Sequence, residues 1–317
     1  MAKIVFHCYG GSHSSVTAAG IYLGMLPGER TASAAELLGV PHYDRYEAVI
    51  HGRFRFIGRG IYGNEVFVLG KRTAGPDTTI FLYKIAELFG CGEEILPVDT
   101  TSPINPLMVV GGFLSRGLHL ISLGRPIVVC GTRLAYPLLA EIAGSASQSV
   151  KERLAPVRRL PSLAKDRFLF YLCPENDLLP LLTAGLHLNP RIAAQELADW
   201  ALQLQFSGKI GALHFLGRAD HYRLYLAGGG GEAEIMGKIL RGMRTLLGIP
   251  QVSLCIVQPA PGSSLLLKAL NKLRKFLFLS SSKVLCKVMR HILIGFTQKC
   301  RREADAVRKS LLEGILD

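Results

Sequence analysis

The first 142 residues alternate short apolar runs with longer stretches in which apolar residues recur every three or four positions. The short runs are typical of strands, and the longer stretches are typical of helices with one buried face. The predicted strands are residues 3–8, 53–58, 65–70, 94–98 and 126–130. The predicted helices are residues 16–23, 32–38, 77–89, 105–115 and 134–142. Ile61-Tyr62-Gly63-Asn64 predicts a hairpin turn between the second and third strands. This alternation predicts an α/β domain of three layers, with a mainly parallel sheet and one hairpin.

The same pattern occurs a second time along the chain. Cys8 aligns with Cys173, and Phe56-Ile57-Gly58-Arg59 aligns with Phe215-Leu216-Gly217-Arg218 at nearly the same spacing. We therefore predict two tandem homologous α/β domains of the same three-layer type. The predicted division is residues 1–144 for the first domain, 145–166 for a linker, 167–300 for a degenerate second copy and 301–317 for a charged C-terminal helix.

Composition narrows the class of protein. Of 317 residues, 49% are hydrophobic and 19% are charged, which excludes a disordered chain. No apolar run of about 18 residues occurs, so we expect no membrane-spanning helix. The seven cysteines include no CxxC pair, which favours a reducing compartment, and the chain start does not look like a signal peptide. We expect a cytoplasmic protein, and the sequence predicts no metal site and no cofactor.

Positive charge gathers near the end of the chain. The net charge is +13, and residues 251–317 contain 12 basic and 4 acidic residues. The segment Lys268–Arg302 could meet an acidic protein or an anionic membrane surface. Its interleaved leucines also fit an ordinary amphipathic helix with a solvated basic face. No RNA-binding aromatic motif accompanies it, so we do not expect nucleic acid as a partner.

The strongest candidate site follows the first strand. A glycine-containing loop between a strand and a helix N-terminus presents backbone N–H groups that favour an anion. The candidate anion-binding residues are Gly10, Gly11, Ser12, Ser14 and Ser15. The same partial positive charge favours a thiolate, so Cys8 is a candidate nucleophile that His13 could support. In the alternative interpretation Gly10-Gly11 only turns the chain, Ser15 caps the helix and Cys8 is a buried strand residue.

The second copy helps to weigh these interpretations. It keeps Cys173 but replaces the loop with Pro174, Glu175, Asn176, Asp177, Leu178, Leu179 and Pro180. Folding alone therefore does not require the first loop, although a cysteine retained in a changed loop could also be structural.

Two further polar residues follow predicted strands. Asp99 is a candidate general acid, and Arg133 is a candidate phosphate clamp. A helix N-cap and a surface arginine are the alternative roles. His7 is interpreted as a core histidine.

His7-Cys8-Tyr9-Gly10-Gly11-Ser12-His13-Ser14-Ser15 resembles the opening of an uncharacterised bacterial family, the domain of unknown function numbered 3189. Further residues that carry the resemblance are Gly58-Arg59, Tyr62-Gly63-Asn64-Glu65-Val66, Val98-Asp99-Thr100, Gly111-Gly112-Phe113-Leu114-Ser115-Arg116 and Gly124-Arg125-Pro126. The resemblance covers residues 3–142 and implies no established activity. That family is found mainly in spore-forming Gram-positive bacteria.

The loop alone is also similar to two better-understood loops. Low-molecular-weight tyrosine phosphatases and arsenate reductases have Cys-x5-Arg after a strand, whereas Ser14 stands at the arginine position here. The cysteine-phosphorylated B component of sugar phosphotransferase systems has a Cys-x-x-Gly loop without that arginine, which Cys8-x-x-Gly11 fits better.

Two functions remain open. The N-terminal domain could bind a phosphorylated small molecule or an inorganic anion, with phosphoryl or phosphate-ester chemistry through Cys8. Alternatively, the protein could be a non-enzymatic sensing or assembly module that uses its basic C-terminal surface.

Overall fold

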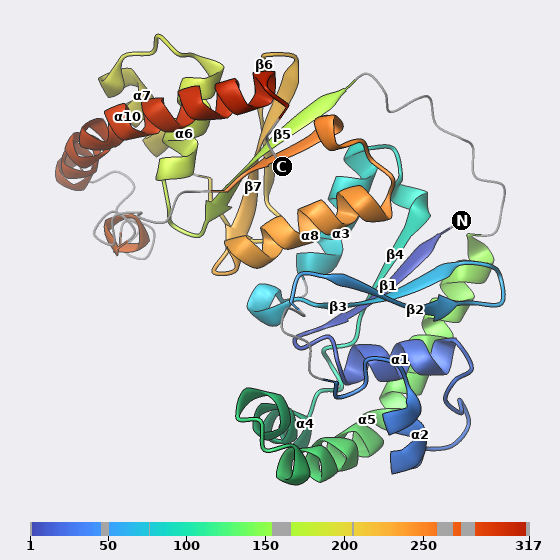
Figure 1. The fold of residues 1–317 in the computed structure, drawn as a ribbon. Coiled ribbons are helices and arrows are strands. Elements are labelled where there is room, and N and C mark those ends of the chain that lie inside the picture. The colour runs from blue at the N-terminus through green and yellow to red at the C-terminus, as the bar shows by residue number, and fades with distance from the viewer. Residues whose placement is uncertain are drawn as a thin grey trace. The chain divides into compact units, whose positions relative to one another are not determined.

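The computed structural model divides the chain into two units, residues 1–161 and 162–317. It describes residues 2–45, 51–75, 77–153, 166–204, 206–258, 269–273 and 283–314. Both units are mixed α/β and contain a four-stranded sheet, as the alternating pattern predicts (Figure 1).

In the first unit the sheet order is β2-β3-β1-β4. Its elements are β1 (Lys3–Cys8), α1 (Ser14–Tyr22), α2 (Ala34–Gly39), β2 (Phe54–Arg59), β3 (Glu65–Gly70), α3 (Asp77–Leu88), β4 (Ile95–Asp99), α4 (Pro106–Gly112), a π-helical turn (Phe113–Gly117) and α5 (Ile121–Glu152). β1 pairs in parallel with both β3 and β4, while β2 pairs antiparallel with β3. The central β1 is buried on both faces and reads as one apolar run, as expected for a parallel strand covered by helices.

The second unit repeats this topology, with the order β6-β7-β5-β8. Its elements are β5 (Arg167–Pro174), α6 (Leu179–Leu188), α7 (Ala194–Gln203), β6 (Leu213–Ala219), β7 (Tyr222–Gly230), α8 (Ala233–Leu246), β8 (Leu254–Val257) and α10 (Lys283–Leu312). The two hairpins share an irregularity at the same place, between Phe56 and Gly58 and between Phe215 and Gly217. Cys8 pairs with Gly70, and Cys173 pairs with Gly228. The two cysteines therefore hold equivalent sheet positions.

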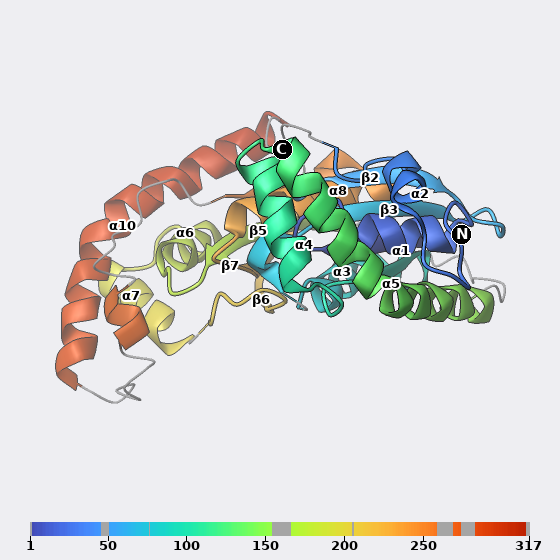
Figure 2. The ribbon, with the colours of Figure 1, turned by 90° about the horizontal axis from the view of Figure 1, so that it is seen from below.

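Helices cover the sheet of each unit. In the first unit α1 and α5 lie on one side of the sheet and α3 lies on the other (Figures 1 and 2). Figure 2 shows α4 beside the beginning of α5. In the second unit α10 packs on α6 and α7.

The prediction of a strand at residues 126–130 is wrong, because these residues lie inside α5. A short run of β-branched residues is compatible with a buried strand and with a buried helical segment. The spacing of the buried positions over a longer stretch distinguishes the two. The buried positions Gly124, Val128 and Thr132 recur every four residues, followed by Ala135 and Leu139, so one helical stripe faces the core. α5 also continues to Glu152 past the predicted boundary at 144, and α10 runs unbroken across the predicted boundary at 300.

Helix α5 is long and apolar enough by composition to cross a membrane. It also supplies Val128, Tyr136 and Leu139 to the core of the first unit. These contacts are those of a core helix in a globular domain.

The basic segment Lys268–Arg302 is described only in part. Lys268, Arg274 and Lys275 lie outside the described residues, whereas Lys272 is exposed in residues 269–273 and Lys287 is exposed on α10.

Glycines bring α4 and α5 together. A Cβ atom added to Gly111 would collide with the backbone of Val128, and one added to Gly124 would collide with the backbone of Ser115. The two helix backbones thus touch directly, and this contact positions the π-helical turn between them.

We expect Gly124→Ala to destabilise the first unit by about 1–3 kcal/mol, because the added methyl group forces two backbones apart. Gly144→Ala is the matched control in the same helix, since nothing lies within 4 Å of its added Cβ. That control should instead raise stability by about 0.5–1 kcal/mol through helix propensity. Urea unfolding measures both values, and equal effects of the two substitutions would contradict the close contact.

Candidate functional site

The segment from Cys8 to Ser15, here called the Cys8 loop, connects β1 to α1. Gly11 has φ +70°, and a Cβ atom there would lie 2.6 Å from the backbone nitrogen of Gly70. Glycine is therefore required at this turn. His13 is the N-cap residue of α1, and Ser14 and Ser15 form its first turn. The loop presents the beginning of the helix to the carboxyl end of the sheet, where α/β proteins bind ligands.

Cys8 is buried and its sulfur contacts the rest of the loop. The Gly11 backbone N–H donates to Sγ at 3.0 Å, and Ser15 Oγ lies 3.3 Å from Sγ. Burial raises the pKa of Cys8, but hydrogen bonds from the Ser14 and Ser15 side chains and from the Ser15 and Gly11 amides outweigh burial. The pKa of this thiol therefore lies below its ordinary value. A depressed pKa is what a cysteine nucleophile needs.

Arg116, from the π-helical turn, covers the loop from the other side. Its Nη1 donates to Ser12 Oγ, and a Cβ atom at Gly10 would lie 2.6 Å from its Nη2. Burial lowers the pKa of Arg116, while the charges of Cys8 and Asp44 act in the opposite direction. The Arg116 guanidinium group and a cysteine of lowered pKa therefore lie at the same loop. Because Gly10 has no side chain, the Arg116 guanidinium group can lie directly beside it.

Asp44 fixes the surroundings of this arginine. Its carboxylate is 3.1 Å from His13 Nε2 and accepts hydrogen bonds from Ser115 Oγ at 2.9 Å and from Arg125 Nε at 2.9 Å. Burial raises the pKa of Asp44, but these partners outweigh burial and lower it to about 2. Asp44 stays ionised and joins the Cys8 loop to the π-helical turn and to α5.

A pocket of about 850 Å³ opens beside the Cys8 loop. The loop contributes Cys8, Tyr9, Gly10, His13 and Ser14 to its wall, and Arg116 closes the polar end. The remaining wall consists of His51, Thr101, Ile104, Met108, Val109, Gly112, Phe113 and Gly117. The pocket thus joins a polar end around Cys8 to an apolar wall on α4.

The structure brings all the loop candidates together. Ser12, Ser14 and Ser15 are buried, and Gly10 and His13 line the pocket. Among the hydroxyl groups, Ser14 and Ser15 bond to Cys8, whereas Ser12 bonds to Arg116.

Asp99 lies at the end of β4 in a separate cluster. It accepts a hydrogen bond from the buried Lys71 Nζ at 2.7 Å and others from the backbone and side chain of Thr101. Burial raises the pKa of Asp99, but these partners outweigh burial and lower it. His7 is fully buried beside them, and burial lowers its pKa to about 3. Asp99 is therefore ionised, which is not the form that a general acid needs.

Arg133 is exposed in the middle of α5, because the strand that was expected to end beside it is part of this helix. It does not line the pocket beside the Cys8 loop. The arginine at the loop is Arg116 instead. One feature of the sequence could have pointed to Arg116. Arg116 aligns with Arg274 of the second copy, and Arg125 aligns with Lys283, so both positions are basic in both copies.

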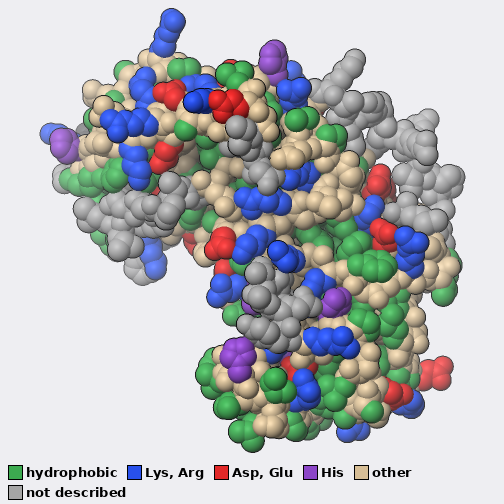
Figure 3. All heavy atoms as spheres, in the orientation of Figure 1, with side chains coloured by type: hydrophobic (Ala, Val, Ile, Leu, Met, Phe, Trp, Pro, Cys, Tyr) green, Lys and Arg blue, Asp and Glu red, His purple; other side chains and the backbone are tan. Residues whose placement is uncertain are grey.

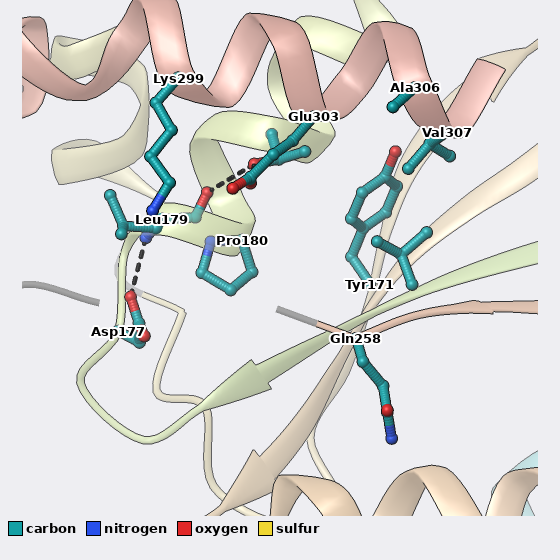
Figure 4. A pocket seen from close by; sticks show the side chains of 11 residues that line it. Tyr171, Asp177, Leu179, Pro180, Gln258, Lys299, Glu303, Ala306 and Val307 are labelled. Carbon is teal, nitrogen blue, oxygen red and sulfur yellow. Dashed lines mark hydrogen bonds between the residues drawn. The ribbon is translucent and has the colours of Figure 1, made fainter. Parts of the chain in front are cut away.

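The second unit has a different environment around the equivalent cysteine. Burial and the charge of Asp177 raise the pKa of Cys173 well above its ordinary value. A smaller pocket of about 190 Å³ lies nearby (Figure 4). There the Asp177 carboxylate accepts a hydrogen bond from the Leu179 backbone N–H. The Thr183 hydroxyl donates a hydrogen bond to the Glu303 carboxylate. Asp177 thus lies in the loop after β5, whereas the corresponding loop of the first unit has glycine and serine donors.

Among the described residues no group of three or more His, Cys, Asp or Glu side chains is placed to hold a metal ion.

The rate of Cys8 alkylation by iodoacetamide should reach half of its maximum at a lower pH than for a free cysteine peptide, because the loop stabilises the thiolate. Ser15→Ala should move this midpoint to higher pH, since it removes a hydrogen bond to sulfur. Thr17→Ala, which removes a buried hydroxyl of the same helix that does not bond to sulfur, should leave the midpoint unchanged. Peptide mass spectrometry measures the rate at each pH. A wild-type midpoint equal to that of the free peptide would contradict the depressed pKa.

Comparison with known proteins identifies the first unit only. No curated protein and no solved structure matches the chain. Residues 3–146 match the model of the family described as "Protein of unknown function (DUF3189)". The match spans the sheet, the Cys8 loop, α4 and the part of α5 that carries Arg125. The N-terminal half of this chain is thus a domain of the DUF3189 family.

Proposed function

We propose that the first unit binds the phosphate group of a small molecule in the Cys8 loop, and that Cys8 is the nucleophile for phosphoryl transfer. The observation that supports this most is the position of Arg116. Phosphatase loops of the Cys-x5-Arg type place an arginine within the loop, whereas this chain has Ser14 there. Arg116 brings a guanidinium group to the same loop from a distant element.

The anion would be held by three kinds of donor. The first turn of an α-helix leaves backbone N–H groups without intrahelical partners, and its dipole favours negative charge. The hydroxyl groups of Ser12 and Ser14 lie in the same loop, and the Arg116 guanidinium can donate two parallel hydrogen bonds to phosphate oxygens. Burial strengthens these interactions, since water competes less well inside the pocket.

Cys8 lies at the base of this arrangement. In the proposed reaction its thiolate forms an S–P bond with a phosphate monoester while the P–O bond to the alcohol breaks. The alkoxide that leaves takes a proton from water, and water then hydrolyses the cysteinyl phosphate to inorganic phosphate. Arg116 would stabilise the charge on the equatorial oxygens in both steps. Asp99, being ion-paired with Lys71, is not assigned the role of general acid.

His13 is assigned a role in the second step. If its Nε2–H donates to Asp44, its Nδ1 is unprotonated and can accept a proton from the attacking water. Burial lowers the pKa of His13, which favours this neutral form.

We place the protein in the bacterial cytoplasm. Its seven cysteines include no CxxC pair, which suits a reducing compartment, and spore-forming bacteria are expected from the family resemblance. The second unit, with its raised cysteine pKa, is proposed to act as a scaffold.

Binding of inorganic phosphate, measured by isothermal titration calorimetry, tests the anion site. Arg116→Met should weaken binding about 10- to 100-fold, because a charge-assisted hydrogen bond is lost. Arg133→Met, the same change of charge on the exposed face of α5, should leave the affinity unchanged. Loss of binding in Arg133→Met but not in Arg116→Met would overturn the assignment of the clamp.

Release of phenol from phenyl phosphate tests the chemistry. Cys8→Ser should abolish turnover while phosphate still binds, and Cys173→Ser should retain turnover. Turnover that survives in Cys8→Ser would overturn the role of Cys8. A wild-type protein that binds phosphate without turnover would instead support a sensing function of the same site.

A further inference from the structure

We infer that the phosphorylated ligand of the Cys8 loop is a lipid-like phosphate, whose apolar chain lies along α4. This inference rests on the proposed function and names its substrate class. We base it on the lining of one pocket, which combines the residues of the proposed phosphate site with apolar side chains.

The pocket is much larger than a phosphate group requires. Its volume of about 850 Å³ lies in the range of about 300–1,000 Å³ that is typical of pockets for whole small molecules. Phosphate at the Cys8 loop would leave most of this space to the rest of the ligand. The pocket lining includes the apolar side chains of Ile104, Met108, Val109 and Phe113. A chain of methylene groups matches this wall better than a sugar, whose hydroxyl groups need donors and acceptors.

Two of these wall residues are largely exposed without a ligand. Val109 is 60% exposed and Phe113 is 59% exposed, although both line the pocket. Further exposed apolar residues lie on the same α4–α5 hairpin. They are Leu107, Val110, Leu118, Leu120, Ile121 and Leu123. Hydrophobic side chains are visible on this end of the first unit in Figure 3.

Exposed apolar side chains gathered on one hairpin are typical of a site that binds a lipid or another apolar partner. Val109 and Phe113 belong both to this group and to the pocket lining, which favours the lipid, because one chain can contact both.

Charge around the hairpin also favours an anionic amphiphile. No acidic residue occurs between Asp99 and Glu141, whereas this stretch contains Arg116, Arg125 and Arg133. Arg125 is paired with the buried Asp44, and Arg116 faces the Cys8 loop. Since the charge of Arg125 is compensated by Asp44, Arg116 and the exposed Arg133 are the cationic groups that accompany the apolar residues, and this combination interacts with anionic lipids.

A series of n-alkyl phosphates from ethyl to octyl, kept below their aggregation concentrations, tests the inference. Calorimetry should show an affinity that rises by up to about fourfold for each added methylene group, the value for full burial of CH₂. Inorganic phosphate measures the anion site alone. Adenosine monophosphate tests whether exposed Tyr9 and Phe113 stack a base instead.

Val109→Ser/Phe113→Ser should remove the dependence on chain length and leave the affinity for inorganic phosphate unchanged. Both side chains are more than half exposed, so the unit should tolerate their replacement. Leu134→Ser is the matched control, since Leu134 is 67% exposed on α5 but does not line the pocket.

The results distinguish failure of the lipid inference from failure of the proposed function. Dependence on chain length that disappears only in the double variant supports the inference. Phosphate binding without such dependence, tighter binding of adenosine monophosphate than of octyl phosphate, or dependence that survives the double variant overturns it and leaves the proposed function standing. If inorganic phosphate does not bind, the proposed function fails and the inference fails with it.

Discussion

The buried carboxylate of Asp44 is the interaction on which the site depends. It is 3% exposed and joins the Cys8 loop, through His13, to a distant stretch of the chain, through Ser115 and Arg125. A buried charge is tolerated only when it is paired and hydrogen-bonded, and a carboxylate with these partners meets that condition. Because Ser115 precedes Arg116, the same contact sets the position of the guanidinium group over the Cys8 loop. Arg116 thus reaches the Cys8 loop through tertiary structure and not through the sequence of the loop itself.

The two units show how strongly the environment decides the chemistry of one residue type. Cys8 and Cys173 occupy equivalent places in two sheets of the same topology, and both are buried. Burial raises the pKa of each thiol. In the first unit the loop hydrogen bonds overcome this effect, whereas in the second unit the charge of Asp177 adds to it. A cysteine conserved in position within one chain is thus no evidence of conserved reactivity, and only the first unit has the environment of a nucleophile.

The sequence predicted the parts of the fold that depend on local pattern. The four strands of the first unit, the hairpin turn and the repeat follow from apolar periodicity and from turn residues. The strand predicted at residues 126–130 was wrong because its run of β-branched residues is compatible with both structures. The Cys8 loop was predicted as a group since its residues are neighbours in the chain. Arg116 and Asp44 were not predicted, because their meeting depends on the packing of α4 against α5, which no local pattern encodes.

That packing also bears on the apolar surface of the hairpin. Where two helices meet through bulky side chains, the apolar residues of each are needed to hold the pair together. Here Gly111 and Gly124 bring the backbones into direct contact, so the contact face is made of the smallest residue. The bulky residues Val109, Val110 and Phe113 of the hairpin are at least half exposed. Because so much of each side chain is exposed, the stability of the hairpin does not account for their apolar character. The ligand proposed above would account for it, since Val109 and Phe113 also line the pocket that contains Cys8 and Arg116.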